Sequence, residues 1–217
     1  MMTEKFIAEL DTLKKDLVKM GRLAVWMLRS SIIALKDHDE ALASEVNSKK
    51  LELARMDVTI EDEALRLIAL NQPVARDLRT IACVLKMETY LARVGRYGKD
   101  IAQVAVELGQ KPHLSKLVSI PYMSDVAAGM VEDALKAFET GDLKLVEGFS
   151  EKDDSLDSMR WSVFRECVTY MIEDPKNITQ CAHYIMIAKY LERVADHACK
   201  MSEKIHYMVT GEHIEVK

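Results

Sequence analysis

The sequence is poor in the residues that make turns. Its 217 residues contain only eight glycines and four prolines. A β-sandwich or β-barrel needs turn residues at short, regular intervals, so this scarcity argues against an all-β fold. Apolar residues make up 49% of the chain and charged residues 30%. This balance is usual for a soluble helical protein that buries its core as one large domain or two small ones.

Several enzyme motifs are also missing. The scattered glycines form neither GxxxxGK[ST] nor GxGxxG, and the sequence contains no GxSxG and no HExxH. These motifs bring backbone amides to phosphates, expose a nucleophilic serine, or bind zinc through two histidines. A helical core filled by apolar residues also leaves little room for a pocket. We therefore expect a protein that is not an enzyme.

The sequence also lacks the features of nucleic-acid-binding, membrane-spanning and secreted proteins. The formal net charge of −5 gives no general attraction to nucleic acid, so we expect no nucleic-acid partner. No apolar run reaches the length of a membrane span, and the first residues (MMTEK) do not resemble a signal peptide. The four cysteines form no CxxC pair, so we expect buried thiols in a cytoplasmic protein.

What the chain does contain is an apolar pattern at alternating spacings of four and three residues. In its last long segment this pattern runs through Tyr184, Ala188, Leu191, Ala195, Ala198, Ser202, Ile205 and Val209. Such spacing is typical of a helix that packs lengthwise on its neighbours. The segment also has a counterpart 100 residues earlier, because YLARV at 90–94 is similar to YLERV at 190–194. This similarity indicates a duplicated helical unit.

The pattern and its interruptions predict an all-α fold of six long helices. We expect them at about 3–35, 40–70, 73–108, 121–140, 143–173 and 175–210, the fifth with an interruption near Gly148. Asp39 is expected as an N-cap, and Gly109 and Gly211 as C-terminal stops. The predicted architecture is two tandem antiparallel three-helix bundles, at 1–110 and 121–217, joined by a linker at 111–120.

Pairs of carboxylates at helical spacing are the most informative polar feature. Glu192 and Asp196 lie four residues apart beside the apolar seam, so they project from one face of the last helix. The preceding helix carries Asp154 and Asp157, with Asp153 and Asp157 as an alternative pair. If these two helices are antiparallel neighbours, four carboxylates face one another on the outer side of the bundle. That arrangement suits Fe³⁺, Mn²⁺ or Mg²⁺ and, less specifically, Zn²⁺.

The same carboxylates have a simpler interpretation. Lys189, Arg193 and Lys200 lie within reach of Glu192 and Asp196 along the helix and can neutralise them without a metal. Charged pairs at helical spacing usually belong to a solvated face, and His197 is expected at the surface or the rim. Spacing alone therefore leaves open whether a metal binds.

These segments resemble the PhoU family of phosphate-uptake regulators. Residues 72–79 (QPVARDLR) are similar to the family's QPVAxDLR segment, and residues 191–198 (LERVADHA) to its LERIGDHA segment, which contains an E/DxxxD metal motif. Residues 170–175 (YMIEDP) resemble the family's join between the fifth and sixth helices. The resemblance extends over the whole chain in length, duplication and helix order.

The resemblance implies a cytoplasmic regulator that usually forms a homodimer and binds metal on the bundle surface. It also implies docking at the membrane on two partners, the high-affinity phosphate ABC transporter (through its ATPase subunit) and a sensor histidine kinase. Membrane association is then peripheral and runs through these partners. The implied role is to shut down phosphate-starvation signalling when phosphate is plentiful.

The resemblance also implies metal ligands, and here the two repeats differ. Glu192 and Asp196 match the second metal motif, with Asp154 and Asp157 on the preceding helix, and Asp57 and Glu61 match the corresponding positions of the first repeat. The third helix, however, has Ala92 and Arg96 where the motif has carboxylates. We therefore expect iron, zinc, manganese or magnesium in the second repeat rather than the first, where Arg96 forms a salt bridge with Asp57 or Glu61. The alternative is a metal-independent helical adaptor that regulates another transporter.

Overall fold

The structure is a computed structural model that describes residues 4–114 and 119–216. Its described residues form helices and no strand, which confirms the all-α prediction. Residue 3, where the first helix was expected to begin, lies outside the described residues. The elements are α1 (Glu4–Asp37), α2 (Glu40–Ser48), α3 (Lys50–Asn71), α4 (Ala75–Leu108), α5 (Ser119–Thr140), η1 (Leu143–Val146), α6 (Phe149–Glu173), η2 (Pro175–Asn177) and α7 (Ile178–Thr210).

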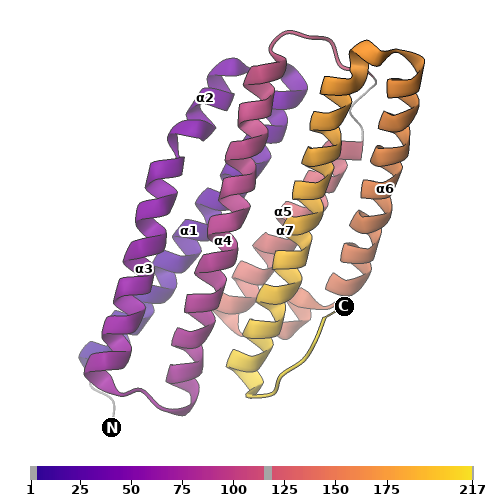
Figure 1. The fold of residues 1–217 in the computed structure, drawn as a ribbon. Coiled ribbons are helices and arrows are strands. Elements are labelled where there is room, and N and C mark those ends of the chain that lie inside the picture. Colours follow the sequence, from indigo (N-terminus) through magenta and orange to yellow (C-terminus); the bar gives the residue numbers. More distant parts are fainter. Residues whose placement is uncertain (1–3, 115–118, 217) are drawn as a thin grey trace.

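The helices stand side by side as two three-helix bundles, with α2 and α3 together acting as one long arm of the first (Figure 1). Helices α1, α4, α5 and α7 form the centre, since α1 packs on α4 and α5 while α7 packs on α4 and α5. The α2–α3 arm covers one outer side and α6 the other (Figure 1). No helix among the described residues is long and apolar enough to cross a membrane.

The predicted helix between 40 and 70 is in fact broken in the middle. Asp39 is the expected N-cap, since its carboxylate accepts a 2.9 Å hydrogen bond from the backbone N–H of Leu42. At the break, the Lys49 N–H bonds back to the Val46 carbonyl at 3.1 Å, a tighter turn than the α-helix makes. The Ser48 hydroxyl donates to the Glu45 carbonyl at 2.7 Å, a side-chain contact that often bends helices.

Two predicted helix starts at prolines are displaced. Helix α4 begins at Ala75 rather than at Pro73, because Gln72 is left-handed (φ 47°) and Val74 is extended. Helix α5 begins at Ser119, two residues before the expected start at Pro121. A proline in the first turn is tolerated because the first four N–H groups of a helix have no partner within it.

The start of the last helix differs from the prediction as well. Residues Pro175–Asn177 form a short 3₁₀ turn, and the α-helix begins only at Ile178. The side chain of Asp174 accepts a 3.0 Å hydrogen bond from the Lys176 N–H and so caps this turn. The expected interruption near Gly148 is confirmed, since 3₁₀ helix η1 precedes it and α6 follows it.

The core follows the predicted seams. In α7, seven of the eight seam residues are buried and Val209, close to the C-terminal end, is half-buried. All four cysteines are buried thiols, as expected. Helix α4 lies close to α1 at Gly98, where an added Cβ would lie 2.7 Å from the backbone carbonyl carbon of Met27. Only glycine fits there without displacing a helix.

The two bundles meet through rings on α4 and α7. His197 stacks between Tyr90, with ring centroids 5.4 Å apart, and Tyr97, at 6.0 Å, and Tyr97 stacks on Tyr190 at 5.2 Å. His197 is buried, so the expectation of a surface or rim position was wrong. Burial, together with the positive charges of Arg93 and Arg193, lowers the pKa of His197 to about 4. The ring is therefore neutral at pH 7 and serves the packing between the bundles.

Candidate functional site

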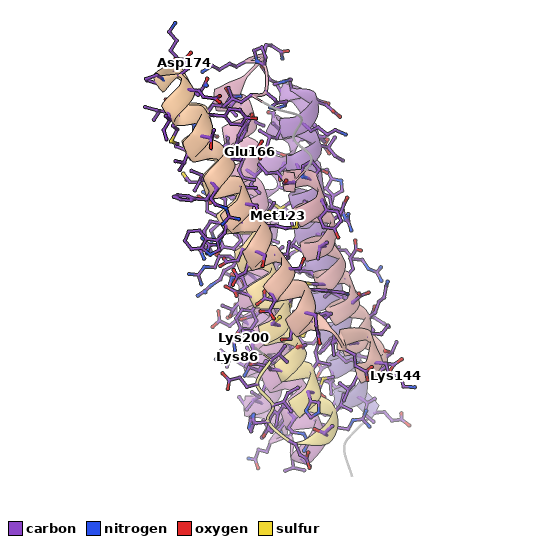
Figure 2. The ribbon with its side chains drawn as sticks, turned by 90° about the vertical axis from the view of Figure 1, so that its right-hand side faces the viewer. Lys86, Met123, Lys144, Glu166, Asp174 and Lys200 are labelled. Atoms are coloured by element: carbon purple, nitrogen blue, oxygen red, sulfur yellow. The ribbon has the colours of Figure 1, made fainter. Side chains whose placement is uncertain are left out.

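The candidate site is the outer side of the second bundle where α6 packs on α7, a line of contact that we call the α6–α7 groove. Figure 2 shows α6 at the edge of the molecule, running down from Asp174 past Glu166 toward the level of Lys200. The lower part of α6 carries Asp153 and Asp157, and α7 carries Glu192 and Asp196 opposite them. The four carboxylates thus come from two antiparallel neighbours, as the sequence predicted for this pair of helices.

The surroundings of Asp153 perturb the charge of its side chain. Its side chain is half-buried, and its Oδ1 is shielded from solvent without a hydrogen-bond partner. Burial, followed by the negative charges of Asp196, Asp157, Glu192 and Asp154, raises the pKa of Asp153 to about 6. Because neighbouring carboxylates contribute to this shift, negative charge in the groove is incompletely neutralised at Asp153.

Basic side chains neutralise most of the remaining charge. The side chain of Glu192 is 9% exposed and accepts hydrogen bonds from Lys189 Nζ at 2.6 and 2.7 Å. Arg193 Nη1 lies 3.5 Å from Asp196, and its Nε lies 3.9 Å from Glu192. Lys200, which the sequence suggested as a further counter-ion of this pair, instead pairs with Glu203 at 2.7 Å.

Arg160 is a basic residue of this groove that the sequence reasoning missed. Its Nε lies 3.8 Å from Glu192 Oε1 and 3.9 Å from Asp157 Oδ1. No hydrogen bond accompanies these contacts, since Arg160 Nε is buried without a hydrogen-bond partner. The signal was available, because Arg160 follows Asp157 by three residues on the same helix, a spacing at which side chains meet.

The acidic residues predicted on α6 occupy different places. Asp157 is exposed at the edge of the groove beside Arg160, and Asp154 is also exposed and acts on Asp153 only through its charge. The inward position belongs to Asp153, from the alternative pair, because residues 153 and 157 are one helical turn apart and share a face. The structure thus brings together Asp153, Asp157, Glu192 and Asp196.

The first bundle has a different acidic cluster on α3 and α4. Asp57 is half-buried, and burial and the negative charge of Glu61 raise its pKa. The positive charge of Arg96 has the opposite, smaller effect on the pKa of Asp57. Glu88, which the sequence reasoning missed, is only 5% exposed, and its Oε2 is buried without a partner. Burial and the charges of Asp57 and Glu61 raise the pKa of Glu88 to about 7.

Arg96 does not form the expected ion pair. Within residues 4–114 and 119–216, no carboxylate oxygen of Asp57 or Glu61 lies within 4.0 Å of its guanidinium nitrogens. Arg96 is exposed, and its charge still opposes the rise in the pKa of Asp57. The long, flexible side chain remains in water because an exposed ion pair gains little over full hydration.

The donor atoms beside the α6–α7 contact are of the chemical type that hard cations bind. Carboxylate oxygens are the ligands that Mg²⁺ and Mn²⁺ prefer, and they also serve Fe and Zn sites. The unpartnered oxygen of Asp153 is a further available donor. Among the described residues, however, no three His, Cys, Asp or Glu side chains stand close enough together to hold a metal ion. Lys189 and Arg160 lie among these carboxylates, so cation binding requires the basic groups to move.

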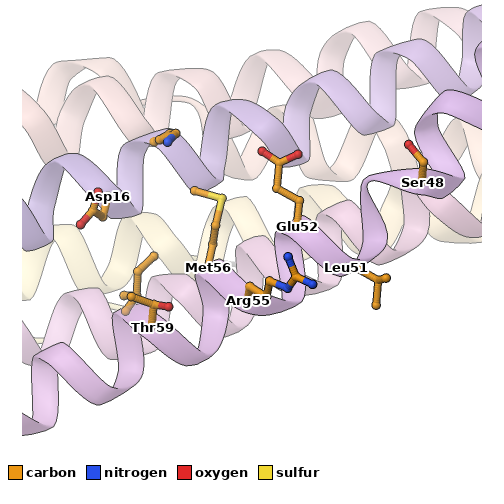
Figure 3. A pocket seen from close by; sticks show the side chains of 9 residues that line it. Asp16, Ser48, Leu51, Glu52, Arg55, Met56 and Thr59 are labelled. Atoms are coloured by element: carbon orange, nitrogen blue, oxygen red, sulfur yellow. The ribbon is translucent and has the colours of Figure 1, made fainter.

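A second hollow lies between α1 and α3 in the first bundle (Figure 3). It has a volume of about 590 Å³, and Figure 3 shows Glu52 and Met56 reaching from α3 toward α1 while Leu51 points away. Acidic and basic side chains alternate around it, with Asp16 on α1 and Arg55 on α3. The hollow is open and its polar groups do not converge on one point, unlike a small-molecule site.

Comparison with known proteins places these features in a family. The PhoU domain model matches the chain twice, at residues 17–105 and 120–205. A phosphate-specific transport system accessory protein PhoU homolog from Caulobacter vibrioides is 37% identical over 207 residues, covering 95% of this chain and 90% of that protein. One of the same name from Clostridium acetobutylicum is 31% identical over 217 residues and covers 99% of both chains.

Solved structures agree with this grouping. The crystal structure of PhoU from Pseudomonas aeruginosa superposes with a TM-score of 0.91 at 32% identity, covering 95% of this chain and 100% of that one. The phosphate transport system regulatory protein PhoU from Streptococcus pneumoniae shares the fold, with a TM-score of 0.87 at 24% identity over 97% of this chain and 99% of that one. The duplicated bundle, the segments at 72–79 and 191–198 and these similarities together show that the chain belongs to the PhoU family.

Proposed function

We propose that this protein regulates phosphate uptake and phosphate-starvation signalling by docking on other proteins rather than by catalysis. The observation that carries the proposal is similarity along the entire chain, in both repeats, to proteins named as accessory proteins of the phosphate-specific transport system. Because the match extends from one bundle to the other, a docking surface that depends on their arrangement is retained as a unit.

The proposed partners are the ATPase subunit of the phosphate ABC transporter and a sensor histidine kinase. The regulator acts from the cytoplasm as a homodimer and reaches the membrane through these two proteins. Exposed apolar side chains support these partners in addition to the family similarity. The outer helices expose large apolar side chains, including Leu65 on α3 and Trp161, Phe164 and Ile172 on α6, and such side chains are suited to contact with another protein.

We further propose that the groove between α6 and α7 binds a cation of the iron, manganese, zinc or magnesium type. Asp157, Glu192 and Asp196 are the proposed ligands together with Asp153, whose position in the groove makes it a better candidate than Asp154. Burial and, after it, the negative charges of the neighbouring carboxylates raise the pKa of Asp153. The contribution of these charges supports the proposal because a divalent ion removes their repulsion. Asp57 and Glu61 are not proposed as a second site, since Arg96 places a positive charge beside them.

The regulatory role is tested with a transcriptional reporter of phosphate starvation. We expect the reporter to stay active in phosphate-rich medium when the gene is deleted, and to be repressed again when the intact gene is restored. Co-purification of the restored protein with the ATPase subunit and the kinase checks the docking. A deletion strain that represses the reporter normally would contradict the proposed regulation.

The role of the cation is tested in the same strain with Glu192→Ala/Asp196→Ala, and with Asp57→Ala/Glu61→Ala as the matched control in the first bundle. Both variants remove two carboxylates from one outer helical face. We expect loss of repression only for the first variant. Full repression by both variants would favour the alternative of a metal-independent adaptor.

A further inference from the structure

The connection that follows α4 is held by side chains from both bundles. The carbonyl of Gly109, just after α4, accepts a 2.7 Å hydrogen bond from Nδ1 of His38, on the turn that follows α1. Further along, the carbonyl of Pro112 accepts a 2.9 Å hydrogen bond from the side-chain amide of Gln180 on α7. Residues 109–114, which we call the connecting segment, are therefore anchored to the first bundle at one point and to the second at another.

Within this segment, the ring of His113 contacts both bundles at once. Its Nε2 lies 3.1 Å from the carbonyl oxygen of Lys36, near the end of α1, and its Nδ1 lies 2.7 Å from the hydroxyl of Tyr184 on α7. A carbonyl oxygen only accepts hydrogen bonds, so Nε2 carries a proton. In the neutral ring Nδ1 is then an acceptor, and the hydroxyl of Tyr184 donates to it.

The surroundings of Tyr184 fix the direction of this hydrogen bond. Tyr184 is 5% exposed and Gln180 is 1% exposed, and the amide of Gln180 also donates to the hydroxyl oxygen at 2.8 Å. A second proton, placed on Nδ1 of His113, would set two donors against each other across 2.7 Å. The buried hydroxyl would have to turn away and lose its acceptor, which costs free energy.

The ring of His38 also opposes a positive charge on His113. The two rings stack with their centroids 4.3 Å apart and their planes 18° from parallel. Burial lowers the pKa of His113, the hydrogen bond to Lys36 acts in the opposite direction, and the charge of His38 lowers the pKa again. The net effect is a pKa below the ordinary value of 6.5, so the ring is neutral at pH 7.

The helices around His113 supply no countercharge in contact with it. The titratable side chains that face the ring are His38 and Tyr184. Lys36 contributes its carbonyl, while its side chain is exposed. On the last turn of α4, Glu107 lies 3.7 Å from His183 on α7, and so its carboxylate is directed to that ring.

We propose that His113 is a proton-sensitive latch, which ties the connecting segment to α1 and α7 while its ring is neutral and releases it when the ring gains a second proton. Release leaves the bundles joined by the stacked rings of α4 and α7. Because the latched ring binds the second proton less tightly than a free one, the latch is intact above about pH 6.5 and weakens as the pH falls below that value. The latch goes beyond the proposed regulation and does not depend on the proposed cation site.

The test is amide hydrogen exchange of Lys111, His113 and Leu114 in the intact protein, followed by NMR at pH 7.5 and pH 5.5 and corrected for the intrinsic effect of pH. A free group with a pKa of about 6.5 that must stay neutral in the latch weakens it by at most about tenfold between these values. We expect the protection of these amides to fall by between about threefold and tenfold at the lower pH.

Two histidine variants make the result specific. His113→Gln keeps one donor and one acceptor but does not titrate, so we expect nearly equal protection at the two pH values. His206→Gln is the matched control, because His206 is a half-buried histidine near the other end of α7 that bonds to the Glu212 carbonyl. We expect this variant to keep the fall seen in the parent.

Tyr184→Phe separates the latch from simple packing, because it keeps the ring and removes only the hydroxyl. Nδ1 of His113 then no longer faces a donor, and we expect the pKa of His113, measured by NMR, to rise toward 6.5. A role in packing alone would lower protection at both pH values and leave this pKa unchanged. The unfolding midpoint at pH 7.5 checks that the variant is folded.

Several results would overturn the latch. They are a change in protection below about twofold in the parent, an equal fall in His113→Gln, and a pKa of His113 that does not respond to Tyr184→Phe. An equal fall in the amides at the middle of α4 would show that the whole bundle loosens at low pH, and it would also overturn the proposal.

Discussion

The two bundles carry acidic clusters on corresponding helices, yet these clusters are neutralised in different ways. In the second bundle, Asp153, Asp157, Glu192 and Asp196 are accompanied by Arg160, Lys189 and Arg193. In the first bundle, Glu88 is buried with an unpaired oxygen beside Asp57 and Glu61, and Arg96 remains exposed. The duplicated fold thus preserves the place of the cluster while its charge balance changes.

The repeats differ at the positions of the acidic motif on the third helix of each bundle. At an offset of 100 residues, Ala92 corresponds to Glu192, Arg96 to Asp196 and Glu88 to Ala188. The first bundle therefore lacks the two carboxylates of the motif and carries another carboxylate one turn earlier. The absence of the carboxylate pair and the presence of Arg96 favour an ion-independent surface in the first bundle, whereas the second bundle has four carboxylates from two helices. The following predictions test this contrast, from the largest expected effect to the smallest.

The largest effect is expected when the motif is restored in the first bundle. Ala92→Glu/Arg96→Asp gives α4 the acidic pair of α7 beside Asp57 and Glu61. We expect one more cation-binding event per chain than in the parent, for which we propose one, measured by calorimetric titration with Mn²⁺. Asp57→Ala/Glu61→Ala added to this variant must abolish the new event. If the transplanted pair binds nothing, the spacing of carboxylates is insufficient and the difference between the bundles has another origin.

Gly98 and Gly129 provide a contrast in packing. Gly98→Ala places a Cβ 2.7 Å from the Met27 backbone carbon, so α1 and α4 must separate, and we expect a loss of roughly 3 kcal/mol in the free energy of unfolding. Gly129→Ala is the control, because nothing lies within 4 Å of that position; helix propensity predicts a gain of about 0.5–1 kcal/mol. Urea unfolding measures both, and equal effects would contradict the close approach at Gly98.

The apolar spacing of the sequence was sufficient to predict most of the fold. The four-three spacing predicted the seams and all six helical regions, because burial of one helix face is written into the periodicity of each segment. It did not predict the break at Lys49, where hydrogen bonding tightens around a serine side chain. It also missed the burial of His197, because packing of α4 on α7 depends on two segments 100 residues apart.

For the candidate site, the sequence identified the helices better than the inward residues. Glu192 and Asp196 flank a clear seam and were placed correctly on the face toward α6. On α6, however, the spacing allowed two pairs, Asp154 with Asp157 or Asp153 with Asp157. Only the position of the neighbouring helix distinguishes between these pairs. Glu88 was missed because a single glutamate in an apolar stretch gives no pairing pattern, although its burial raises its pKa to about 7.

Glu88 should make the first bundle sensitive to pH. Its pKa is about 7 in the folded protein against about 4.5 in the unfolded chain, so the folded state binds the proton more tightly. Stability is unaffected by this group below pH 4.5, falls as the pH rises from 4.5 to 7, and stays reduced above pH 7. Glu88→Gln should thus raise the free energy of unfolding by about 2 kcal/mol at pH 8 and change it little at pH 4.

Urea unfolding at a series of pH values tests this expectation. Comparison with Glu88→Gln isolates the group, because Asp57 and Asp153 also have raised pKa values and contribute to the slope in both proteins. A stability difference between the two proteins that does not vary from pH 4 to pH 8 would show that Glu88 keeps an ordinary pKa.

The smallest effect is expected for Arg96. Its charge lowers the pKa of Asp57 from an exposed position without an ion pair, so Arg96→Gln should cost only about 0.5 kcal/mol at pH 8 and low salt. The loss should disappear in 1 M NaCl, where charges are screened beyond about 3 Å. A loss of several kcal/mol that salt does not change would instead show that Arg96 holds the cluster through direct contact.

The central claim is that cation binding belongs to the second bundle and not to the first. Elemental analysis of protein purified without a histidine tag tests it most directly, with intact protein, Glu192→Ala/Asp196→Ala and Asp57→Ala/Glu61→Ala measured together. We expect iron, manganese or zinc in the intact protein and in the first-bundle variant, and its loss from the second-bundle variant. Metal that persists without Glu192 and Asp196, or equal absence from all three proteins after reloading, would contradict the account.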